Sequence, residues 1–99
     1  MRRLPVDPER LADLCRRHGM RRLSLFGSVL DGTDGPESDI DLLVEFEPAS
    51  IPSLFGMAAI ELELSNLFGR RVDLRTAAEL SRYFRDEVVR RAEPQYVAP

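Results

Sequence analysis

Two aspartates with one residue between them, Asp39 and Asp41, open an apolar stretch and are the first residues whose spacing could support chemistry. Residues two apart on a β-strand point to the same side, with Cβ atoms about 6–7 Å apart. Two carboxylates placed in this way can converge on a hard divalent cation, which prefers oxygen ligands. Taken alone, such a pair is more typical of a solvated strand end beside an acidic loop. A cation site therefore needs support from other residues.

Gly27 and Ser28 give that support, because they close an earlier apolar stretch and ten residues separate Ser28 from Asp39. Glycine permits a tight turn and a close backbone approach, and a serine hydroxyl with nearby N–H groups can hold phosphate oxygens. A helical turn that begins at Val29 would add a favourable dipole for an anion. The combination predicts a phosphate-binding turn that faces two metal-binding carboxylates.

A third acid, Asp73, stands in a short apolar stretch after the longest predicted helix. If this stretch forms a strand beside the one that carries Asp39 and Asp41, the three carboxylates meet. Three carboxylates around two Mg²⁺ ions about 3.5–4 Å apart suit the in-line transfer of a phosphoryl or nucleotidyl group. The alternative is that Asp73 is a short, exposed strand residue without a ligand.

The elements that must position these residues follow from the spacing of apolar residues and turn formers. The first half of the chain is predicted to form a helix after Asp7-Pro8 that ends at Gly19, a strand at 21–26, a short turn from Val29, a loop at 31–38 and a strand at 40–46. The second half is predicted to form a helix at 53–68, a strand at 71–74 and a last helix. A capping box at 76–79 opens this last helix, which continues over 86–92 and ends at Pro94. This order predicts one α/β (α+β) domain over residues 1–99, with helices flanking a small mixed sheet.

Two helices have apolar faces that predict the core. Cys15 and His18 recur at helical spacing and are expected at the core or its edge. The helix at 53–68 has a broad apolar stripe, and Leu54, Phe55, Met57 and Ile60 are expected in the core. The stripe is wide for a helix with one buried face, so some of these side chains could face a partner.

Charge is unevenly distributed along the chain, although the total is only −3. Residues 23–69 contain nine acidic and no basic residues, and all fourteen basic residues, every one an arginine, lie in the two flanks. Direct binding of nucleic acid is not expected, because there is neither a uniformly basic composition nor an aromatic and basic platform. One cysteine and one histidine exclude an internal disulfide and a Cys/His zinc site.

Neither a membrane span nor a secretory signal is expected. No run approaches the ~20 apolar residues of a spanning helix. Residues 1–7 have a basic start without the apolar region of a signal peptide. A single cysteine fits the reducing cytoplasm, which is the expected location.

The run from residue 25 to residue 46, with Gly27-Ser28, ten residues and Asp39-x-Asp41, resembles the motif of the nucleotidyltransferase (polymerase-beta-like) superfamily. The residues around both motifs are similar to those of the minimal branch of that superfamily, the MNT domains. Asp73 stands where those proteins place their third acid. The resemblance covers residues 7 to 92 and implies the nucleotidyltransferase fold.

The resemblance also implies a role for each motif residue. Ser28, next to Gly27, would contact the β- and γ-phosphates of ATP. Asp39 and Asp41 would hold two Mg²⁺ ions, and Asp73 would complete the metal site and help to activate an acceptor hydroxyl. Similar MNT proteins are antitoxins that transfer AMP to a tyrosine of a HEPN-domain toxin. The alternative is a binding module that neutralises its partner by contact, with a vestigial site.

One position departs from the family pattern. Many relatives carry a basic residue at the position of Asp31, and acidic residues at 34 and 37 continue the loop here. A phosphate-neutralising cation is therefore missing locally. The metals could suffice, or Arg70, Arg71 or Arg75 from the following flank could reach the site.

Overall fold

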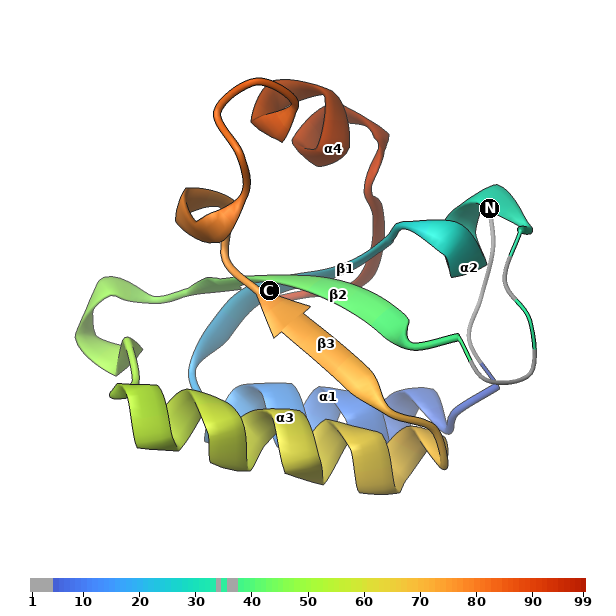
Figure 1. Ribbon diagram of the computed structural model, residues 1–99. Helices are drawn as coiled ribbons and strands as arrows, with labels where there is room; N and C mark the ends of the chain where they lie inside the picture. The colour runs from blue at the N-terminus through green and yellow to red at the C-terminus, as the bar shows by residue number, and fades with distance from the viewer. Residues whose placement is uncertain (1–4, 34, 36–37) are drawn as a thin grey trace.

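The computed structural model describes residues 5–33, 35 and 38–99. In chain order, its elements are α1 (Pro8–Arg17), β1 (Met20–Phe26), α2 (Ser28–Asp31), β2 (Ile40–Phe46), a 3₁₀ turn at Pro48–Ser50, α3 (Leu54–Phe68), β3 (Val72–Arg75), a 3₁₀ turn at Ala77–Glu79, α4 (Arg85–Arg91) and β4 (Glu93–Val97). Figure 1 shows α1 and α3 side by side under one face of the sheet, with α2 and α4 toward the other face. The expected loop residues Asp34 and Glu37, and most of the N-terminal segment 1–7, lie outside the described residues.

The sheet is mixed, as predicted, and has the strand order β3-β2-β1-β4. β1 pairs with β2 and β4 in antiparallel fashion, whereas β2 and β3 run parallel. α3 supplies the crossover that a parallel pair requires. The two strands that carry the aspartates are therefore neighbours.

Local sequence explains where the helices begin and end. The Asp7 side chain accepts a hydrogen bond from the Glu9 N–H at 3.0 Å and caps α1, with Pro8 at the first helical position. Ser53 caps α3 in the same way through the Gly56 N–H at 3.1 Å. Gly69, at φ +67°, ends α3 in the left-handed conformation. These boundaries confirm the predicted ends of both helices.

The core lies between the sheet and the pair α1 and α3. In β2, Ile40, Leu42 and Val44 are buried on one face, as their alternation predicted. They pack in one cluster with buried residues of α1, β1, α3 and β3. The other face of β2 carries Asp41 and Glu45, with the half-buried Leu43 between them.

The C-terminal part of the chain differs from its prediction. The capping box at Thr76 and Glu79 is present but starts only a 3₁₀ turn, and the helix begins at Arg85. The Arg85 guanidinium donates hydrogen bonds to the carbonyls of Ala77, Ala78 and Leu80. The guanidinium thus provides hydrogen-bond partners for carbonyls that a continuous helix would have bonded to its own N–H groups.

A fourth strand was missed because Pro94 was interpreted as a helix end. Pro94 instead lies in β4, where it pairs with Ser24 of β1. β4 is an edge strand, and proline is tolerated there because one side of the strand has no ladder partner to lose.

Two core predictions on α3 were wrong. Ile60 is buried and Met57 packs against the core, but Leu54 and Phe55 are 85% and 88% exposed. Phe55 lies two residues, or about 200° around the helix, from Met57. It therefore faces away from the sheet. None of the helices in the described part of the chain is long and apolar enough to cross a membrane.

Candidate functional site

Asp41 and Asp73 are register partners in the parallel pair of β2 and β3. Because both alternate with buried residues, they lie on the sheet face away from the core. Asp39 precedes β2 by one residue and is two positions from Asp41. The prediction that Asp73 lies beside the strand of the other two aspartates is confirmed.

Gly27 brings the turn after β1 against this group. Phe26, the last residue of β1, pairs with Asp41, and Gly27 follows with φ +78° and ψ −153°. A Cβ atom at residue 27 would lie 2.2 Å from Oδ2 of Asp41, so only glycine fits. The backbone N–H of Ser28 also lies close enough to the Asp41 carboxylate to lower its pKa. The two predicted motifs are thus in direct contact.

The electrostatics of Asp41 reveal a local excess of negative charge. Burial raises the pKa of Asp41 above its ordinary value, and repulsion from Asp73 and Asp39 raises it further. Arg75 and the Ser28 N–H lower that pKa but do not cancel the effect. A bound cation would relieve the repulsion among the three carboxylates.

Two arginines of the following flank reach the aspartates, as one of the sequence hypotheses allowed. The Arg75 Nε lies 3.0 Å from Oδ1 of Asp73, and the Arg71 Nε lies 3.8 Å from Oδ2 of Asp39. Arg70 instead donates to the carbonyls of Ser38 and Gly35 and so holds the loop before β2.

These ion pairs bear on whether the aspartates fit Mg²⁺. Among the described residues, no three Asp, Glu, His or Cys side chains are gathered tightly enough to form a metal site. Asp39 and Asp73 each pair with an arginine rather than with a common centre. The donor set nevertheless fits, because Asp41 and Asp73 are neighbours on one sheet face, Asp39 directly precedes β2, and all three carboxylates are hard oxygen ligands.

Polar side chains of α3 hold β3 in place, and sequence reasoning missed them. The Ser65 hydroxyl accepts a hydrogen bond from the Val72 N–H at 2.9 Å, and the Glu61 carboxylate accepts one from the Leu74 N–H at 2.8 Å. Both N–H groups flank Asp73 on the outer edge of the sheet. No sequence signal separates these two residues from ordinary solvent-facing polar positions on a helix.

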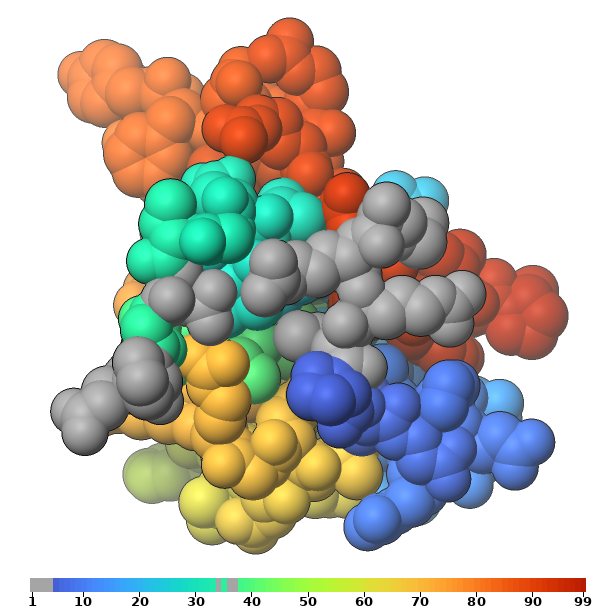
Figure 2. Space-filling model, turned by 90° about the vertical axis from the view of Figure 1, so that its right-hand side faces the viewer, coloured from blue at the N-terminus to red at the C-terminus, as the bar shows by residue number. Residues whose placement is uncertain are grey.

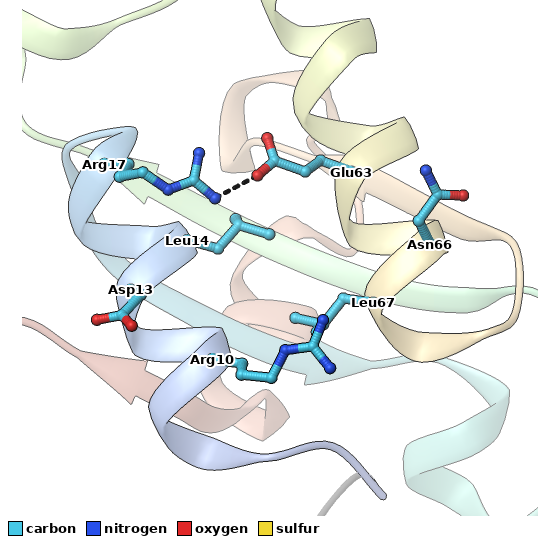
Figure 3. A pocket seen from close by; sticks show the side chains of 7 residues that line it. All are labelled: Arg10, Asp13, Leu14, Arg17, Glu63, Asn66 and Leu67. Carbon is cyan, nitrogen blue, oxygen red and sulfur yellow. Dashed lines mark hydrogen bonds and ion pairs between the residues drawn. The ribbon is translucent and has the colours of Figure 1, made fainter.

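Residues of α1 and α3 line a hollow of about 440 Å³ on the helix side of the sheet, the side opposite the aspartates. Figure 3 shows that Arg17 reaches across it to Glu63. His18 also contacts Glu63, at 2.9 Å.

Cys15 is buried, and burial raises the pKa of its thiol to about 12, which leaves it unreactive at neutral pH. Cys15 and His18 therefore have structural roles, as expected.

Comparison with known proteins gives a family match across most of the chain. The model of the family described as "Nucleotidyltransferase domain" matches residues 9–95. The protein adenylyltransferase MntA of Thermococcus cleftensis is 44% identical over 62 residues, which are 63% of this chain and 61% of that protein's length.

Solved structures share the same architecture. A structure described as that of a candidate minimal nucleotidyltransferase is 40% identical, has a TM-score of 0.72 and covers 88% of this chain and 87% of its own. A complex of a tri-AMPylated Shewanella oneidensis HEPN toxin with an MNT antitoxin gives a TM-score of 0.64 at 19% identity, covering 92% of this chain and 70% of that one. The second likeness concerns the fold alone.

Proposed function

We propose that this chain, which belongs to the nucleotidyltransferase domain family, transfers AMP from ATP to a hydroxyl of a HEPN-type toxin. It would thereby act as an antitoxin. The expected acceptor is a tyrosine. The chain would act as a single domain in the cytoplasm. The observation that carries the proposal is the register pairing of Asp41 with Asp73 beside the Gly27–Ser28 turn.

Each residue of the site has a distinct task in this reaction. The Ser28 hydroxyl and the turn at Gly27 bind the β- and γ-phosphates. Asp39, Asp41 and Asp73 would hold Mg²⁺, two ions being expected, which supplies charge neutralisation at the α-phosphate and the pyrophosphate. Burial and the repulsion from Asp73 and Asp39 raise the pKa of Asp41, and that repulsion would favour uptake of the cation.

The transfer is an in-line displacement. The acceptor oxygen forms a bond to the α-phosphorus, while the bond between that phosphorus and the bridging oxygen of the pyrophosphate breaks. Asp73, which is 33% exposed in its side chain, accepts the proton of the hydroxyl. Arg75, paired with Asp73, must give way for this step.

The choice of partner rests on the relatives. The Thermococcus relative is named a protein adenylyltransferase, and a structural neighbour is an MNT antitoxin with an AMPylated HEPN toxin. The acceptor is therefore proposed to be a protein of the HEPN class rather than a small molecule or a nucleic acid.

The test is incubation of the chain with Mg²⁺, ATP labelled at the α-phosphate and a HEPN-type partner. We expect label on the partner, lost in the double variant Asp39→Asn/Asp41→Asn. The matched control is Glu45→Gln/Glu47→Gln, which removes two carboxylates that pair with Arg21 away from the aspartates. The control should label the partner normally.

Neutralisation of the toxin provides the second readout. If Asp39→Asn/Asp41→Asn still silences the partner, the enzymatic proposal is wrong and the chain acts by contact. Mass spectrometry of the labelled partner identifies the acceptor residue.

A further inference from the structure

The nucleotide site has a shortage of positive charge near its phosphate-binding turn. Residues 23–69 contain no basic residue, and Asp31 ends α2 only three residues after Ser28. ATP carries several negative charges on its phosphates, and repulsion by nearby carboxylates weakens its binding. Any cationic side chain beside this turn therefore comes from another part of the chain.

The arginines of the β3 flank contact the aspartates or the loop before β2 rather than the phosphate-binding turn. Arg71 and Arg75 pair with Asp39 and Asp73. Arg70 donates to backbone carbonyls before β2. All three approach the site from the side of β3, which is separated from β1 by β2.

Arg91 approaches from the opposite side, next to the turn itself. Its Nη2 lies 2.9 Å from Oδ1 of Asp31, although the two residues are 60 positions apart. Arg91 and Gly27 line the same hollow of about 270 Å³ between α2 and α4. Figure 2 shows the teal α2 segment lying against the orange-red C-terminal region.

β4 is the element that brings Arg91 to this place. Glu93, two residues after Arg91, pairs with Leu25 near the end of β1. The backbone at Arg91 is thus anchored beside the strand that leads into Gly27. Glu87 also lines the hollow, but it pairs with Arg90. Arg91 is the one arginine among the described residues that line it.

We infer that Arg91 is a phosphate-binding residue of the nucleotide site, and that Asp31 is a positioning residue that holds its guanidinium beside the Gly27–Ser28 turn until ATP binds. The side chains of the pair are 59% and 42% exposed, and an exposed ion pair contributes little to stability. Arg91 can therefore exchange Asp31 for a phosphate, which a guanidinium binds with two parallel hydrogen bonds. This inference rests on the proposed nucleotide site.

The experiment is a double-mutant cycle on the dissociation constant of ATP with Mg²⁺, measured by calorimetry without the partner. Arg91→Ala should raise the constant about 10-fold. Arg91→Lys, which keeps the charge, should raise it less. The matched control is Arg90→Ala, which removes the neighbouring arginine that pairs with Glu87 and should bind ATP as the wild type does.

Asp31→Asn separates the two roles. In the wild-type background it releases Arg91 and removes one repelling carboxylate, whereas in the Arg91→Ala background it only removes the carboxylate, so it should tighten ATP binding more in the wild-type background. Equal tightening in both backgrounds would mean that Asp31 acts through its own charge, and would overturn its positioning role. Melting curves for every variant check that the fold is retained; if Arg91→Ala is unfolded, Arg91→Lys and Asp31→Asn carry the test.

Failure of this inference is distinct from failure of the proposed function. If the wild type binds ATP and neither Arg91→Ala nor Arg90→Ala changes the dissociation constant, the role of Arg91 is overturned but the proposed function is not. Absence of ATP binding by the wild type overturns both. ATP binding that depends on Arg91, without label on any HEPN-type partner, supports the inference while contradicting the acceptor.

Discussion

Gly27 and Asp41 are in such close contact that the backbone of one occupies the space beside the carboxylate of the other. A Cβ atom on residue 27 would lie 2.2 Å from Oδ2 of Asp41 and 2.9 Å from its Cγ. The contact joins the end of β1 to β2 and sets the position of a carboxylate relative to the phosphate-binding turn. The two motifs thus depend on each other sterically.

Substitution of Gly27 tests that dependence. Gly27→Ala should displace the Asp41 carboxylate and abolish transfer of label. Gly69→Ala is the matched control, because Gly69 also has a positive φ, +67°, but has nothing within 4 Å of the added Cβ. Gly69→Ala should cost about 1–2 kcal/mol of stability, as measured by urea unfolding, and leave activity intact. Normal activity in Gly27→Ala would mean that the contact is not needed.

Asp41→Asn should stabilise the protein while it inactivates it. The folded state raises the pKa of Asp41, so as pH rises the unfolded chain loses this proton first. Stability therefore falls as pH rises through the window between the ordinary and the raised pKa, and it stays lower above that window. At neutral pH the variant should therefore be more stable than the wild type in thermal unfolding, and below the ordinary carboxyl pKa the two should be equally stable. A gain that does not change with pH would contradict this cause.

Ser65→Ala should weaken the position of Asp73. It leaves the Val72 N–H without its partner, which costs about 1–3 kcal/mol and loosens the outer edge of β3. Ser53→Ala is the control on the same helix, since it removes only the cap on the Gly56 N–H and costs about 0.5–2 kcal/mol. The rate at which the partner is labelled is compared under conditions in which both variants are equally folded. This rate should fall for Ser65→Ala and not for Ser53→Ala. Equal rates would show that β3 needs no support from α3.

ATP binding should depend steeply on a divalent metal. The three aspartates repel one another and an anionic triphosphate, and a cation removes both effects. Calorimetry with Mg²⁺ and then with EDTA gives the comparison, and Asp39→Asn/Asp41→Asn should show a smaller difference between the two conditions. Tight ATP binding in EDTA would argue against a metal at this site.

Much of the fold and the site could be predicted because the signals are local. Alternation of apolar residues defined β2, capping residues defined the ends of α1 and α3, and turn formers marked Gly27. The C-terminal strand could not be predicted, because Pro94 and a short, half-buried segment give no alternation. Leu54 and Phe55 were misplaced because hydrophobicity alone does not say which face of a helix meets a sheet.

The sequence by itself determined the residues of the site, their spacing, and the uneven charge that places nine acids and no base in the middle of the chain. Only the tertiary structure decided what compensates that charge. The parallel pairing of β2 and β3 places Asp73 beside Asp41. The pairing of β4 with β1 places Arg91 beside Asp31, although 60 positions separate these two residues in the sequence. Such contacts depend on strand order, because the sheet brings together residues whose separation along the chain carries no periodic signal.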